Sequence, residues 1–236
     1  MKLIFLNIEL DKHLDRIIPF LQKERPDVVC LDEVLQKDIP RLEKELGMRS
    51  EYEPMVLWDT GRDWEPWGTA LLSAHKLTNP RRDYYHGEPG ILHRQVPGDT
   101  KLTNRFLLSA ELVLNNIAYR FGIVHFIWTP DGQVSDFQRS CLTTLLQTLK
   151  EFPGIVFCGD FNAPRGGEIF DTIATHYTDW IPKEYTSSID GQFHRAGALP
   201  YMVDGLFSTP DYRSTNVRLV SGVSDHMAIV ADIERA

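Results

Sequence analysis

Short apolar runs that end in a carboxylate, an amide or an imidazole are the feature that most restricts how this chain can fold. The clearest cases are Asp32-Glu33 after Val28–Leu31 and Gly159-Asp160-Phe161-Asn162 after Ile155–Cys158. Continuous apolar runs of this length are typical of strands that are covered on both faces. Side chains at the ends of rigid, buried strands can be held in fixed positions. The pattern therefore predicts a layered protein whose strand ends carry a polar site.

Predicted helices fall early, in the middle and late in the chain, with hairpin-like strands between them. Helical spacing of apolar residues and typical helix-end residues predict helices over Asp11–Lys23, Asp38–Leu46, Ser135–Phe152 and Glu168–Thr175. Short β-like runs predict strands over Leu3–Ile8, Val28–Leu31, Tyr52–Val56, Thr69–Ser73, Phe106–Leu114, Tyr119–Phe126, Ile155–Cys158, Met202–Ser208, Ser214–Ser221 and Met227–Ile233. The polar stretch Lys76–Asn104 holds three prolines and is predicted to be mostly loop or an irregular hairpin.

This order of elements does not suit a purely parallel sheet. The hairpins between Tyr52 and Phe126 favour two mostly antiparallel sheets packed face to face with helices outside, a four-layer α/β sandwich. A single mixed sheet with helices on both faces is the alternative. No linker, charge block or internal repeat divides the chain, so we expect one domain over residues 1–236.

The overall charge and the cysteine count indicate which partners and which cellular compartment to expect. A formal net charge of -8 lowers the expectation of tight duplex binding, because such binding usually needs a basic face. No apolar run is long enough to span a bilayer, so no membrane partner is expected. An odd number of cysteines, three, without a secretion signal favours the cytoplasm. Nothing in the sequence points to an obligate protein partner.

Each polar motif also has a purely structural interpretation. Glu33 can be an exposed acid that opens a loop, and Asp32 should point the other way if the strand continues. Asp160 and Asn162 either project to one side as functional groups or form an Asx turn that leads to Pro164. The residues taken singly leave these alternatives open.

The two histidines of the apolar runs are equally ambiguous on their own. His226 follows Asp225, and an imidazole beside a carboxylate suits acid/base chemistry or metal binding. Asp204 can accept the other ring N–H of His226 if the two strands are neighbours, or it can be a purely structural acid. His125, alone in an apolar run, is more often a core residue, and Asn7 at the end of the first strand is undecided.

Aromatic and basic residues are candidates for contacts with a substrate. Four tryptophans in predicted loops can stack on a base, sugar or lipid edge, or simply pack in the core: Trp58, Trp64, Trp67 and Trp128. Gly61–Gly68 and Ile127–Gly132 are the predicted rim loops. Arg81–Lys101 is the most basic stretch, and it either contacts phosphates or is a solvated loop.

Taken in order, the motifs resemble the deoxyribonuclease I-like endonuclease/exonuclease/phosphatase superfamily. The resemblance runs from Asn7 to His226 and implies the four-layer α/β sandwich expected above. It implies that Glu33 and Asp225 bind metal, although Asp32 replaces the Gln that usually precedes this Glu. The catalytic residues that it implies are Asn7, His125, Asp160, Asn162, Asp204 and His226.

The resemblance also implies a reaction, the hydrolysis of a phosphodiester or phosphomonoester by in-line attack of water with Mg²⁺ or Mn²⁺. Asp160 is expected to position or activate the water, and His226, oriented by Asp204, to stabilise the phosphoryl oxygens. The expected substrate is a nucleic acid, a nucleotide or a small phosphoester. The alternatives are a catalytically silent binding module on the same fold, a plain scaffold, and a nuclease that acts on extended DNA or RNA.

Overall fold

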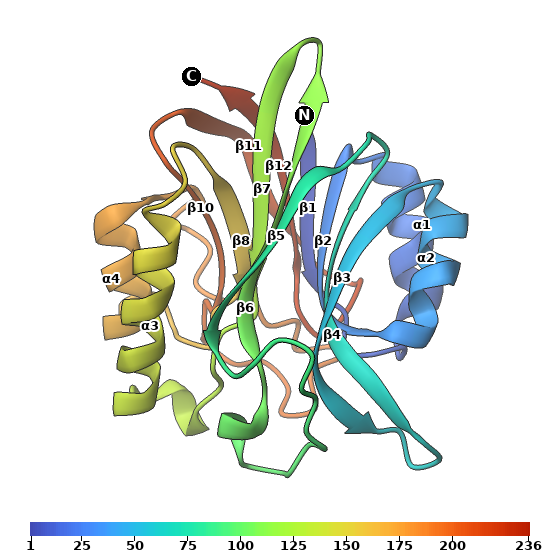
Figure 1. Cartoon of the computed structure of the whole chain (residues 1–236), viewed down its shortest axis with the longest axis vertical. Coiled ribbons are helices and arrows are strands. Elements are labelled where there is room, and N and C mark those ends of the chain that lie inside the picture. Colours follow the sequence, from blue (N-terminus) through green and yellow to red (C-terminus); the bar gives the residue numbers. More distant parts are fainter.

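A computed structural model describes all residues from Met1 to Ala236 as four layers. Two six-stranded sheets face each other, and a pair of helices covers the outer face of each sheet (Figure 1). The helices are α1 (Leu14–Glu24) and α2 (Ile39–Leu46) on one side, and α3 (Asp136–Leu149) and α4 (Glu168–His176) on the other. This confirms the four-layer α/β sandwich and excludes the single mixed sheet. No helix combines the length and the apolar character needed to cross a bilayer.

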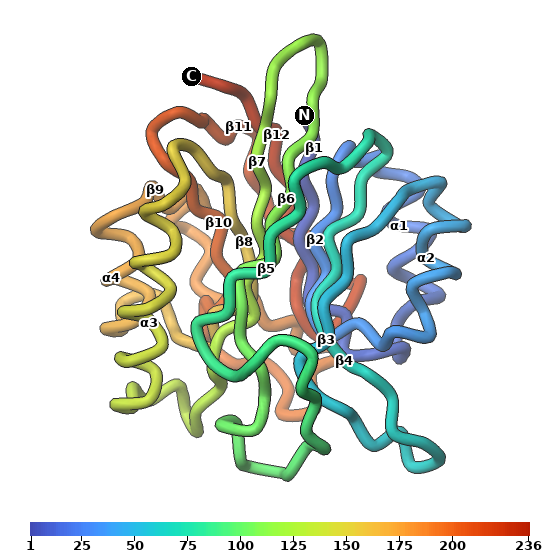
Figure 2. The backbone as a smooth tube through the Cα atoms, viewed as in Figure 1, coloured from blue at the N-terminus to red at the C-terminus, as the bar shows by residue number.

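The two sheets are mostly antiparallel, with one parallel pair in each (Figure 2). The first has the order β11-β12-β1-β2-β4-β3: β11 (Tyr212–Val220), β12 (Ala228–Arg235), β1 (Lys2–Asn7), β2 (Val28–Leu35), β4 (Trp64–Ser73) and β3 (Arg49–Asp59). The second has the order β5-β6-β7-β8-β10-β9: β5 (Thr78–His86), β6 (Arg105–Leu114), β7 (Ile117–Val124), β8 (Val156–Asp160), β10 (Asp204–Ser208) and β9 (Thr178–Asp179).

Burial on both faces explains the continuous apolar runs in the sequence. Along β1, Leu3 and Phe5 belong to the core between the sheets, whereas Ile4 and Leu6 belong to the core beneath α1 and α2. A third core lies beneath α3 and α4. Because successive side chains of a strand point to opposite faces, a strand between two cores must be apolar at nearly every position.

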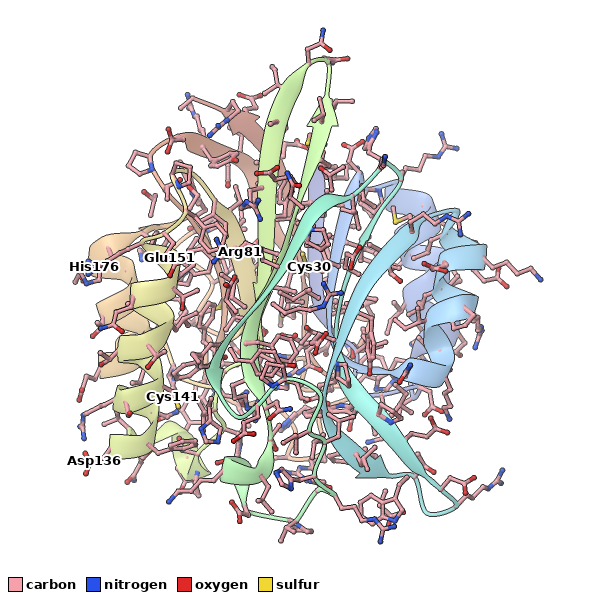
Figure 3. All side chains as sticks on the ribbon, in the orientation of Figure 1. Cys30, Arg81, Asp136, Cys141, Glu151 and His176 are labelled. Carbon is pink, nitrogen blue, oxygen red and sulfur yellow. The ribbon has the colours of Figure 1, made fainter.

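Of the two alternatives for Lys76–Asn104, mostly loop or an irregular hairpin, the loop is wrong for Thr78–His86, which forms strand β5. This strand pairs with β6 at the edge of the second sheet, where Pro80 needs no partner for a missing N–H. Its arginines are occupied within the protein. Arg81 pairs with Asp83 and with Glu151, beside it in Figure 3, and Arg82 pairs with Glu51 and Glu53. These ion pairs add to the hydrogen-bonded pairing with β6 and to the burial of Tyr85, which hold this strand in place.

A bulge in β2 places two adjacent acids near the ends of the sheets. The strand continues to Leu35, beyond its predicted end, and its register against β4 shifts between Leu31 and Val34. Glu33 within this bulge has a positive φ of 63°. A non-glycine residue rarely adopts this conformation unless surrounding contacts stabilise it.

Candidate active site

Polar residues from both sheets meet at the end of the sandwich opposite the two chain termini (Figure 1). They include all eight residues singled out from the sequence. Glu33 lies in the bulge of β2, and the others lie at a strand end or within three residues of one: Asn7, His125, Asp160, Asn162, Asp204, Asp225 and His226. Glu33, Asp160, Asn162, Asp225 and His226 line one cleft of about 530 Å³. Asn7, His125 and Asp204 lie behind them and are buried.

The carboxylate of Asp160 is the centre of this cluster. Its Oδ2 atom accepts a hydrogen bond from Asn7 Nδ2 at 3.2 Å. The Nε2 atoms of His125 and His226 lie 3.8 and 3.9 Å from the same oxygen. Strand β8 can bring Asp160 so close to β7 because Gly159 has no Cβ atom, which would collide with the Val124 carbonyl. The glycine of the Gly-Asp-Phe-Asn motif therefore has a steric role.

Asn7 joins the acids of the two sheets. The same Nδ2 atom that contacts Asp160 also donates to Glu33 Oε1 at 3.1 Å. His125 Nε2 lies 4.0 Å from that Glu33 oxygen. An amide from β1 and an imidazole from beyond β7 thus lie between two carboxylates, one from each sheet.

Asp204 and His226 form a hydrogen bond of 2.8 Å between Asp204 Oδ2 and His226 Nδ1. From the sequence, this bond was expected only if their strands were neighbours. The strands are not neighbours, because β10 and β12 lie in different sheets. The segment before β10 makes the connection. Ile189 forms an isolated bridge with His226, and Ser188 accepts the Met227 amide at 2.7 Å while its hydroxyl accepts the Asp204 amide.

Asp32 was expected to point away from Glu33, and it lies fully buried between the sheets. Its Oδ2 atom accepts the backbone amide of Asp160 at 3.1 Å, which ties the bulge of β2 to the end of β8. The sequence interpretation gave this residue no role, because an Asp beside a stronger candidate carries no distinguishing signal.

Asn162 satisfies both interpretations of its motif. Its backbone amide donates to Asp160 Oδ1 at 2.8 Å, so the Asx turn is present. Its side chain still lines the cleft, with Nδ2 donating to the Phe126 carbonyl at 3.2 Å. Asp225 is buried beside this cleft, and its Oδ1 atom accepts the Ser224 hydroxyl at 3.2 Å.

Burial makes the carboxylates of the cluster hard to ionise. It raises the pKa of Glu33 to about 7, with the charge of Asp225 adding to the effect, and that of Asp160 to about 6. Burial also raises the pKa of Asp225. The protein thus concentrates negative charge that its own cations only partly compensate.

The two imidazoles are shifted in opposite directions. Burial opposes the charged form of His226, but the carboxylates of Asp204 and Asp160 outweigh it and raise the pKa of His226 well above its usual value. Burial lowers the pKa of His125 well below its usual value, and Arg105 and His226 add to this shift. The geometry therefore supplies one charged and one neutral imidazole to the same carboxylate.

The donor set fits a hard divalent cation. Ligand atoms of Asp160, Asp204 and His226 lie within 4.8 Å of one another, and the buried oxygens Asp32 Oδ1 and Asp204 Oδ1 have no hydrogen-bond partner. An excess of carboxylate oxygens is the environment that Mg²⁺, Mn²⁺ and Ca²⁺ prefer. Asp204 is fully buried and already bonded to His226, whereas Glu33 and Asp225 face the cleft.

The four tryptophans singled out from the sequence do not all line the cleft. Trp58 and Trp128 line it, but Trp67 is buried and packs against Trp58 and His125. Trp64 lies outside the cleft lining, against Arg94.

One wall of the cleft is a loop that the sequence did not reveal, because no periodic pattern marks it: His194, Arg195, Ala196, Leu199 and Tyr201.

Comparisons with known proteins agree with this geometry. No curated protein sequence matches the chain. Among solved structures, the catalytic domain of human nocturnin, with bound sulfate, superposes with a TM-score of 0.77 at 17% identity, covering 100% of this chain and 93% of that one. A mannosyl-6-phosphatase from Bacteroides thetaiotaomicron (TM-score 0.72, 11% identity) covers 99% of both chains.

A third solved structure, D. rerio TDP2 complexed with a single-strand DNA product, superposes with a TM-score of 0.70 at 17% identity over 99% of this chain and 98% of that one. At these identities the structures establish the fold. The sequence model of the Endonuclease/Exonuclease/phosphatase family matches residues 5–226, nearly the whole chain. The family comprises nucleases and phosphatases, and the superfamily resemblance seen in the motifs is confirmed. The chain belongs to the endonuclease/exonuclease/phosphatase family.

Proposed function

We propose that the protein is a phosphoesterase that depends on Mg²⁺ or Mn²⁺ and hydrolyses a phosphodiester by in-line attack of water. The observation that carries the proposal is the environment of Asp160 Oδ2, with Asn7 Nδ2 at 3.2 Å and two imidazole nitrogens at 3.8 and 3.9 Å. A carboxylate among hydrogen-bond donors, at the wall of an open cleft, can hold a water molecule and direct it at phosphorus.

Glu33 and Asp225 are the residues that would hold the cation, because both face the cleft and neither is paired with a cationic side chain within hydrogen-bonding distance. The cation supplies neutralisation of charge on the phosphoryl group or on the leaving oxygen. The raised pKa of Glu33, about 7, is consistent with a site that is incomplete without positive charge.

The remaining residues bind and orient the phosphoryl group. His226 is a cation whose ring is held by Asp204 at 2.8 Å, so it can stabilise negative charge that grows on the phosphoryl oxygens. Asp160 accepts the proton of the attacking water or aligns its lone pair. Asn7 keeps Glu33 and Asp160 at a fixed separation, and the buried His125 faces the same two carboxylates from behind the cleft. Asn162 is a further donor to the phosphate.

The shape and charge of the cleft favour a small phosphoester or a short single strand over extended duplex. The cleft volume of about 530 Å³ lies in the size range of small-ligand sites. Two of the three arginines of the basic stretch, Arg81 and Arg82, are neutralised by acids of this chain. An extended duplex would need free cations along its phosphates.

A phosphomonoester is the second candidate substrate, since one structure with the same fold is a mannosyl-6-phosphatase. Another structure with this fold holds a single-strand DNA product, which agrees with the phosphodiester as the first candidate. The test is a hydrolysis screen with Mg²⁺ over bis(p-nitrophenyl) phosphate, p-nitrophenyl phosphate, sugar and inositol phosphates, phospholipid head groups, nucleotides, single strands and duplex. We expect turnover of a diester that Asp160→Asn abolishes. Binding without turnover of any substrate would favour the silent binding module.

A further inference from the structure

The segment after β7, residues 125–127, stays beside the end of β8, where the Phe126 amide donates to the Asp160 carbonyl at 2.8 Å, and side chains bind all three of its carbonyl groups. Ladder pairing of β7 with β8 ends at Ile123, so the carbonyls that follow need other donors. The donors come from four different parts of the chain: Tyr85 Oη and Arg105 Nη1 to His125 O at 3.1 Å each, Asn162 Nδ2 to Phe126 O at 3.2 Å, and Gln138 Nε2 to Ile127 O at 2.8 Å.

Arg105 is unusual among these donors because it brings a charge into the interior. The residue is only 3% exposed, and its guanidinium contacts the His125 carbonyl and, at 3.9 Å, Met55 Sδ. It forms no ion pair, and its Nε atom has no partner. A buried arginine is normally paired with a carboxylate, since an unpaired buried charge is costly.

Burial lowers the pKa of Arg105 below its usual value, and the acids of the active site offset this effect only in part. The acids that interact with it are Asp32, Asp160 and Glu33, which act through the interior at more than ion-pair distance. Tyr85 already satisfies one lone pair of the His125 carbonyl, so Arg105 is not needed merely to avoid an unpaired oxygen. A second, rigid and charged donor instead fixes the direction of that carbonyl.

We propose that Arg105 and Tyr85 are positioning residues that hold the His125 carbonyl and thereby keep the His125 imidazole against Asp160 and Glu33. Through this contact His125 Nε2 stays 3.8 Å from Asp160 Oδ2 and 4.0 Å from Glu33 Oε1. Neither residue is among those that line the cleft, so each acts through His125 and not on the substrate. The kinetic part of this inference depends on the proposed phosphoesterase function.

The kinetic test is a double-mutant cycle on bis(p-nitrophenyl) phosphate with Mg²⁺. Arg105→Met keeps the side-chain volume and should lower kcat by about ten- to a hundredfold with KM nearly unchanged, because a small displacement of a catalytic group is this costly. In the His125→Ala background the same change should lower kcat less than about twofold, since the group that it positions is gone. Equal losses in both backgrounds would overturn the proposal.

Arg120→Met is the control for the loss of a largely covered arginine elsewhere in the same sheet. Arg120 lies on β7 in the same sheet, its side chain is 12% exposed, and it pairs with Glu111 away from the site. This change should lower the melting temperature but leave kcat within about twofold of wild type. If it lowers kcat as much as Arg105→Met, the effect is general destabilisation and the proposal fails.

Two further measurements keep the inference testable if Arg105→Met folds poorly or no substrate is found. Tyr85→Phe removes one hydroxyl and should lower kcat by about three- to tenfold, the effect of one lost hydrogen bond, again only when His125 is present. A crystal structure of Arg105→Lys or Tyr85→Phe should show the His125 ring displaced from Asp160. A ring in its wild-type place in both variants would overturn the proposal without any kinetic measurement. If the wild-type protein hydrolyses no substrate but the ring is displaced in the variants, only the proposed function is contradicted.

Discussion

The side chain of Asp32 accepts the backbone amide of Asp160 at 3.1 Å and so connects the two sheets directly beneath the cleft. The bond joins the bulge of β2 to the last residue of β8. Burial raises the pKa of Asp32 well above its usual value, and the neighbouring charges of Asp160, Glu33 and Asp204 add to this shift. Asp32 therefore has one favourable contact, to the amide, in an otherwise unfavourable environment.

Asp32→Asn should stabilise the metal-free protein at pH 7, and Asp32→Leu should destabilise it. The amide keeps an acceptor for the Asp160 N–H and removes a negative charge, which we expect to gain about 1 kcal/mol. Leucine leaves that N–H unpaired, at a cost of about 1–3 kcal/mol. Urea unfolding in a chelator measures both. Equal destabilisation by the two changes would show that the hydrogen bond is unimportant.

Asp160→Asn and His226→Ala should each lower kcat by about two to four powers of ten, the range for a lost acid/base or oxyanion-stabilising group. Both variants should remain folded, since the residues lie at strand ends beside the cleft. Asp136→Asn, a change at an exposed acid of α3, is the control and should keep full activity. Steady-state kinetics and circular dichroism on the same samples separate catalysis from folding, and a wild-type rate in either site variant would contradict its role.

A chelator should abolish activity, and Mg²⁺ or Mn²⁺ should restore it. Glu33→Gln should raise the Mg²⁺ concentration for half-maximal rate by about tenfold or more, because an amide is a weaker ligand for a hard cation than a carboxylate. Glu168→Gln, at an acid that pairs with Arg139 on the surface, should leave the metal requirement unchanged. Full activity in excess chelator would refute metal dependence.

The stability of the metal-free protein should fall as the pH rises from about 4.5 to 7, in part because of Glu33. The folded-state pKa of about 7 exceeds the ordinary value of 4.5, so the folded protein binds this proton more tightly than the unfolded chain does. The stabilisation is complete below the lower pKa and is lost through the higher one. Glu33→Gln should flatten this decline by up to about 3 kcal/mol in the free energy of unfolding, measured by urea titration at each pH. Parallel profiles for the two proteins would show that Glu33 titrates normally.

Trp128→Ala should raise KM by about five- to twentyfold and change kcat little, as expected for a stacking contact made equally in ground and transition states. Trp128 is 43% exposed at the cleft. Trp64→Ala is the matched control, because that ring lies against Arg94 outside the cleft lining. The affinity for a single strand should also depend weakly on salt, since few cations are free to replace counterions. A steep salt dependence would favour an extended nucleic acid instead.

The strands were predictable from the sequence where both of their faces are buried, because such strands are continuous runs of apolar residues. Strands β1, β2 and β8 are examples, since almost every position in them faces a core. Strand β5 was missed because an edge strand stabilised by ion pairs looks like a polar loop in the sequence. Propensity cannot distinguish the two without knowledge of the acids opposite.

The candidate site was predictable in its residue types but not in its connections. The bond between Asp204 and His226 was anticipated, yet it joins different sheets through the Ser188–Ile189 segment, which carries no motif. The positive φ of Glu33 and the buried contacts of Arg105 depend on tertiary structure, so no local pattern encodes them. Residues that support a site from behind look like ordinary strand residues.

The assembly of the site from both sheets has a consequence for the order of events in folding. The hydrogen bonds from Asn7 and Asp32 to Asp160 span 153 and 128 residues of chain. Contacts between such distant segments form slowly, because the intervening chain must be ordered first. Helices and hairpins can form early without creating any part of the cleft. During refolding, the recovery of turnover therefore reports the docking of one sheet on the other, a step that spectroscopic probes of secondary structure do not detect.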